Sequence, residues 1–80
     1  MSFMFEVYYR PPANPGRETA ITERVVNRGG RLDYREDAHA DGSSGICLTF
    51  EFDDFDAAQR TAEELRHLAE HVEGPVDYGG

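Results

Sequence analysis

The chain contains one cysteine, no tryptophan and no lysine among its 80 residues. A single cysteine excludes an intramolecular disulfide and favours a reducing compartment. No apolar run approaches the roughly 20 residues that a membrane-spanning helix needs. The first six residues also lack the basic segment of a secretory signal peptide. We therefore expect a cytoplasmic protein with no membrane partner.

Sequence motifs of the common enzyme classes are missing as well. The sequence has no Gly-x-Ser-x-Gly elbow, no phosphate-binding loop and no dinucleotide-binding fingerprint, so no cofactor is expected. Sixteen acidic residues against eight arginines give a net charge of −8. Because this charge repels phosphate groups, we expect no nucleic-acid partner.

The first half of the chain predicts a strand, a helix and a second strand. Residues 3–10 alternate between apolar and polar side chains with the period of a strand. Asn14 is a typical N-cap residue and Pro15 suits the first helical position, so a helix is predicted from there to residue 27 or 28. Gly29 and its neighbouring glycine end this helix, and residues 31–38 predict the second strand.

The second half predicts a strand followed directly by a long helix. Residues 41–45 have the composition of a hairpin loop, and residues 46–52 alternate as a strand. A helix is predicted from the acidic cap at residues 53–54 to about residues 73–75, and the tail at 76–78 is compatible with a short final strand. The apolar stripe of this helix comprises Phe55, Ala58, Ala62, Leu65, Leu68, Ala69 and Val72.

This order, β-α-β-β-α with the final strand left open, predicts a single α+β domain over residues 1–80 with a ferredoxin-like two-layer sandwich. Both helices then cover one face of an antiparallel sheet. Alternation places Tyr34 on the helix-covered side. It places on the open face a set of polar side chains that is a candidate interface: Glu6, Tyr8, Arg10, Asp33, Arg35 and Glu51.

Residues 15–32 resemble the first helical unit of the ACT domain family. The resemblance rests on the Pro15-Gly16 pair, on Ile21 and Val25 at helical spacing, and on Gly29 and Leu32. Glu18 departs from the pattern, because the family has a buried leucine there. The resemblance implies a ferredoxin-like module that binds an amino acid or another small effector at a dimer interface. It places the candidate ligand-binding residues in one loop: Asn14, Pro15 and Gly16.

Our leading interpretation is therefore a small non-enzymatic domain that acts as a homodimer, either as an ACT-like sensor of a small molecule or as a protein-interaction module. Self-association is expected because a core of this size typically supplies only about 3–5 kcal/mol. The alternative is a small cofactor-independent enzyme of the dimeric α/β-barrel type. Tyr9, Tyr34 and His39 would be its suspected polar groups.

The second predicted helix carries two further groups of polar side chains, a histidine pair and a set of carboxylates. His67 and His71 have the spacing of a helical metal-binding pair, but no third ligand accompanies them, and we predict no metal site. The carboxylates of Glu63, Glu64 and Glu70 would form an acidic surface for a protein partner.

Overall fold

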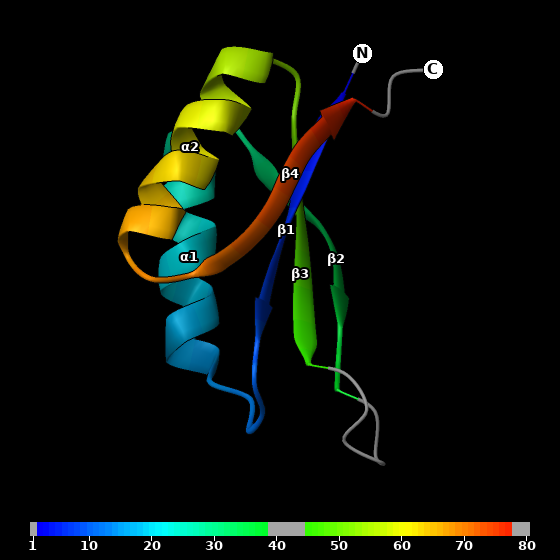
Figure 1. Ribbon diagram of the computed structural model, residues 1–80, viewed down its shortest axis with the longest axis vertical. Helices are drawn as coiled ribbons and strands as arrows, with labels where there is room; N and C mark the ends of the chain where they lie inside the picture. The colour runs from blue at the N-terminus through cyan, green and yellow to red at the C-terminus, as the bar shows by residue number, and fades with distance from the viewer. Residues whose placement is uncertain (1, 39–44, 78–80) are drawn as a thin grey trace.

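The computed structural model describes residues 2–38 and 45–77 and contains four strands and two helices in the order β-α-β-β-α-β. The elements are β1 (Phe3–Tyr9), α1 (Pro15–Asn27), β2 (Arg31–Glu36), β3 (Ile46–Phe52), α2 (Phe55–His67) and β4 (His71–Asp77). The strands form one antiparallel sheet in the order β2-β3-β1-β4, and both helices lie on the same side of it (Figure 1). The predicted ferredoxin-like two-layer sandwich is therefore confirmed.

Helix α1 has the predicted bounds because its ends are encoded locally. The side chain of Asn14 accepts a hydrogen bond from the backbone N–H of Arg17 at 3.1 Å, and Pro15 occupies the first turn. After Asn27 the chain turns through Gly29, whose φ of 93° is the left-handed conformation that glycine adopts readily. Ile21 and Val25 face the core.

Helix α2 starts as predicted but ends earlier. Asp54 caps it by accepting a hydrogen bond from the N–H of Ala57 at 2.8 Å. The helix ends at His67, and Ala69 reverses the chain with a φ of 69°. The prediction of a helix through Val72 was wrong. Leu68 is 50% exposed, whereas Val72 is buried in β4 opposite Val7.

Strand β4 is accordingly longer than the short final strand at residues 76–78 with which the sequence is compatible. It begins at His71 and pairs with β1, and Tyr78 lies outside the described residues. The candidate hairpin loop at 41–45 also falls outside the described part of the chain, apart from Gly45. Among the described helices, none is long and apolar enough to cross a membrane.

The core fills the space between the sheet and the helices. The rings of Phe5 and Phe52 stack with their centroids 5.6 Å apart. The buried cluster comprises Phe5, Val7, Ile21, Val25, Leu48, Phe50, Phe52, Ala58, Ala62, Leu65 and Val72. Because these side chains pack directly against one another, any ligand site must lie at the margins of the layers or on the open face.

A bulge in β2 changes which of its side chains face the helices. Leu32 is opposite Phe50, but the next paired residue is Tyr34, opposite Thr49, so Asp33 is an extra residue. Beyond the bulge the alternation is offset by one position. Arg35 therefore lies on the helix side and Tyr34 on the open face, so both predicted placements were wrong.

Candidate functional site

The entry of α1 is held by a polar network that the sequence did not predict. The hydroxyl of Tyr9 donates a hydrogen bond to the carboxylate of Glu18 and accepts one from the backbone N–H of Asn14 at 2.9 Å. Arg35 donates to the same carboxylate through Nε at 2.6 Å and Nη2 at 3.0 Å. The guanidinium of Arg17 lies 4.8 Å from the centre of the Tyr9 ring. We call Tyr9, Asn14, Arg17, Glu18 and Arg35 the helix-entry network.

Glu18 is the centre of this network. Hydrogen bonds from Arg35 hold the pKa of Glu18 below its ordinary value, although partial burial of the carboxyl acts in the opposite direction. A carboxylate of this kind stabilises the fold above the unfolded pKa of about 4.3, and this contribution is lost as the pH falls through the lower pKa of the folded state. Glu18 also shares the helical stripe of Ile21 and Val25, so its inward position was a signal available in the sequence.

The three candidate ligand-binding residues of the predicted loop lie at the start of α1, where Asn14 has a structural role. The Asn14 side chain is engaged as the helix cap, and the nearest atom to a Cβ added at Gly16 would be Asn14 Oδ1 at 3.7 Å. Of the three candidate ligand-binding residues, Pro15 lines a hollow beside α1.

That hollow is a groove of about 340 Å³ between α1 and the edge strand β2. The α1–β2 groove is lined by Pro15, Glu18, Thr19, Thr22, Glu23, Leu32 and Leu48. Leucine and proline side chains supply apolar surface, and threonine hydroxyls and two carboxylates supply polar groups. This combination of apolar surface with a few convergent polar groups is typical of small-molecule sites.

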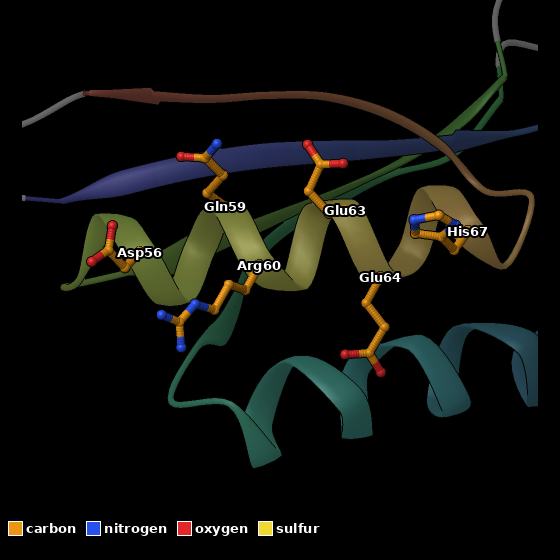
Figure 2. Close-up of a pocket in the computed structure, with 6 residues that line it drawn as sticks. All are labelled: Asp56, Gln59, Arg60, Glu63, Glu64 and His67. Carbon is orange, nitrogen blue, oxygen red and sulfur yellow. The ribbon is translucent and has the colours of Figure 1, made fainter.

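A larger hollow, of about 640 Å³, lies on the outward face of α2 (Figure 2). It is lined by Asp56, Gln59, Arg60, Glu63, Glu64 and His67, all from one helix. Figure 2 shows Glu64 directed towards α1, where it forms ion pairs with Arg24 and with Arg28, the latter at 2.7 Å. All six lining residues are polar or charged, so this surface has no apolar residue against which the body of a ligand could pack. The larger hollow is therefore a weaker candidate than the α1–β2 groove.

The open face brings together part of the predicted interface. Glu6, Tyr8 and Glu51 lie on it, on β1 and β3, as the register of these strands requires. Asp33 is the exposed bulge residue, and Arg35 lies on the other side of the sheet. Arg10 follows the end of β1 and lines a hollow of about 330 Å³ together with Tyr8, Tyr9, Gly45 and His71.

Cys47 does not have the properties of a reactive thiol. It is buried on the open face, with its Sγ 3.5 Å from a carboxylate oxygen of Glu6. Burial raises the pKa of the Cys47 thiol, and the charge of Glu6 raises it further. A nucleophilic cysteine needs the opposite shift, so we assign Cys47 no catalytic role.

The two candidate histidines do not share a helix. His67 ends α2, whereas His71 begins β4 and lies 3.1 Å from the carboxylate of Glu73. Within residues 2–38 and 45–77, no group of three or more potential metal-ligating side chains comes together.

The groups suspected for an enzyme are also separated. Tyr9 lies on the helix side, Tyr34 lies on the open face, and His39 is outside the described residues. Burial and the Glu18 hydrogen bond raise the pKa of Tyr9, so its hydroxyl remains protonated and engaged. Comparison of the chain with protein-family models, with curated proteins and with solved structures finds no match.

Proposed function

We propose that this protein is a small, non-enzymatic, ligand-sensing domain that binds its effector in the α1–β2 groove and acts as a homodimer in the cytoplasm. The observation that supports the proposal most directly is the groove itself, because it has an apolar floor, hydroxyls and carboxylates within about 340 Å³. It begins at Pro15, in the loop where the ACT-like pattern places the effector.

The lining suggests the chemistry of the effector. Leu32 is partly exposed in the groove, and Glu23 gives the groove border negative charge, whereas Glu18 is already paired with Arg35. An ammonium group would be attracted by the Glu23 carboxylate, and an apolar side chain would cover Leu32. An amino acid or a primary amine with an apolar body combines both features.

Thermal unfolding tests effector binding. A true effector at ten times its dissociation constant should add about 1.4 kcal/mol to the free energy of unfolding. This corresponds to a rise in Tm of roughly 6–11 °C for a domain of this size. A panel of amino acids and primary amines is screened by scanning fluorimetry. The variant Leu32→Glu should abolish the shift, because it replaces the apolar surface that the body of the effector would cover with a carboxylate that would have to lose its hydration.

The matched control is Val26→Glu, which changes an exposed apolar side chain of α1 that does not line the groove. This variant should respond to the effector as the unmodified protein does. If no compound on the panel shifts Tm, or if the shift persists in Leu32→Glu, effector binding in this groove is wrong.

The edge of β2 supports a homodimer. β2 ends the sheet, so its outer backbone groups have no strand partner in the described part of the chain. Arg31 and Glu36 are the first and last residues of this strand, and both lie on the open face. In an antiparallel pairing of two β2 edges, Arg31 of each copy would be opposite Glu36 of the other. The edge is therefore self-complementary in charge, as a two-fold interface requires.

Charge reversal tests this arrangement. Arg31→Glu and Glu36→Arg should each be monomeric in sedimentation velocity, because each places like charges opposite one another in the symmetric pair. An equimolar mixture of the two variants should form a heterodimer, since every pair is then opposite in charge. Circular dichroism confirms that each variant is folded, because Arg31→Glu also removes the ion pair with Glu51. A mixture that stays monomeric, or single variants that remain dimeric, would exclude the β2 edge.

The alternative of a cofactor-independent enzyme has less support. The interior between the sheet and the helices is occupied by the core, and the suspected tyrosines lie on opposite sides of the sheet. We therefore favour binding over catalysis.

A further inference from the structure

The open face of the sheet carries a regular array of side chains that the effector site does not use. The strand register places them in three rows across the sheet. With the residues given in the strand order β2, β3, β1, β4, the first row consists of Glu36, Cys47, Tyr8 and His71. The second row consists of Tyr34, Thr49, Glu6 and Glu73. The third row consists of Arg31, Glu51, Met4 and Val76.

Two carboxylate–tyrosine pairs flank the central strand β3. Glu36 and Tyr34 are two residues apart on β2, and Glu6 and Tyr8 are two residues apart on β1, so each carboxylate lies beside a tyrosine on the same face. The β3 residues between the two pairs, Cys47 and Thr49, are small. Because β1 and β2 are separated by two strand spacings, the pairs are roughly 10 Å apart.

The charge on this face is not neutralised. Arg31 is held by Glu51 and Asp53, and His71 by Glu73. Arg10 lies beyond the end of β1.

Among residues 2–38 and 45–77, Glu6 and Glu36 have no cationic partner within 4 Å, and the Glu6 carboxylate lies 3.5 Å from the Cys47 thiol. Partial burial and the negative charge of Glu6 raise the pKa of Tyr8, in keeping with a negative potential here.

We propose that the open sheet face binds an arginine-bearing polypeptide segment, with one guanidinium at Glu6 and Tyr8 and another at Glu36 and Tyr34. A guanidinium can donate two hydrogen bonds to a carboxylate and lie against a tyrosine ring at the same time, which a lysine ammonium does less well. Tyr34 is 60% exposed and available for such a contact.

The same features disfavour other occupants. A second copy placed face to face would bring two acidic surfaces together, because Glu6, Glu36 and Glu73 lie on this face in each copy. Nucleic acids and anionic membranes would be repelled. A small cation could satisfy one carboxylate but could not span both pairs.

The size of the face indicates a short segment as the partner. Four strands of six or seven residues cover roughly 400 Å², well below the roughly 800 Å² that each partner buries in a standard interface between globular proteins. An extended peptide of eight residues spans about 26 Å, which is enough to cross the sheet.

The test measures the anisotropy of a labelled octapeptide that alternates arginine and glycine. The peptide should bind, its affinity should fall as salt is added, and a lysine–glycine peptide should bind several-fold more weakly. The double variant Glu6→Gln/Glu36→Gln should lower the affinity for the arginine peptide by roughly tenfold, as expected for the loss of two exposed ion pairs. Tyr34→Leu should reduce the preference for arginine over lysine.

The control is Asp56→Asn/Glu63→Gln, which removes the same amount of charge from α2, on the other side of the sheet and away from the α1–β2 groove. This control should bind the peptide as the unmodified protein does. Equal weakening by both double variants, or no binding of the arginine peptide, would overturn the proposal. It would also be overturned if the Glu6→Gln/Glu36→Gln variant changed sedimentation while the peptide failed to bind, because a second copy would then cover the face.

Discussion

Replacement of Phe50 by alanine is expected to unfold most of the protein at 25 °C. Phe50 lies on the inner strand β3, its side chain is fully buried, and its ring centroid is 5.7 Å from that of Phe5. Removing a buried phenylalanine side chain typically costs about 3–5 kcal/mol, because apolar contacts are lost and a cavity remains. A domain of this size has only about 3–5 kcal/mol in total. Urea titration followed by circular dichroism measures the loss.

Leu68→Ala is the matched control. The helical periodicity of the sequence places Leu68 on the buried stripe of α2, whereas the structure places it half-exposed at the helix end. Its replacement should change the free energy of unfolding by no more than about 0.5 kcal/mol. A large loss at Leu68 together with a small loss at Phe50 would contradict the end of α2 and the position of β4.

Gly30→Ala is expected to cause the next largest loss in the free energy of unfolding, because the added methyl group has no room. A Cβ at this position would lie 2.5 Å and 2.7 Å from two ring atoms of Phe52 and 2.7 Å from Cγ1 of Val25. Both neighbours are buried core residues, so they cannot move aside freely. Overpacking of this kind typically costs about 1–3 kcal/mol. Thermal unfolding should show a fall in Tm of several degrees for each kcal/mol lost.

Two other glycines separate this steric effect from backbone effects. Gly29 has a φ of 93° and open space around it, so Gly29→Ala should cost about 1 kcal/mol through backbone strain alone. Gly16 lies in the first turn of α1 with no close contact, so Gly16→Ala should be neutral or slightly stabilising. If Gly30→Ala proved as mild as Gly16→Ala, the close packing of α1 against Phe52 would be refuted.

The fold was predictable because its strongest signals are local. The alternation of β1 and β3, the Asn14–Pro15 helix start and the Asp54 cap each specify an element without reference to the rest of the chain. The end of α2 was not predictable in the same way. Leu68, Ala69 and Val72 continue the helical period, and pairing with β1 outweighs that pattern.

The candidate sites depend on a bulge and on the register between strands, and neither is specified by the periodic pattern of a single strand. The bulge at Asp33 offsets β2 by one residue, so Tyr34 and Arg35 exchange their expected sides. Register is set by pairing between strands and cannot be read from one strand. By contrast, Glu18 could have been found, because it shares the inward stripe of Ile21 and is a carboxylate in need of a partner.

The bulge also bears on how the sequence can change over evolution. Deleting Asp33 would leave Leu32 opposite Phe50 and Tyr34 opposite Thr49, so all the remaining side chains of β2 would stay on the same side of the sheet as before. The loss of this one codon is therefore nearly silent for both the groove and the open face. An insertion or deletion elsewhere in β2 would exchange the chemistry of the two surfaces at once.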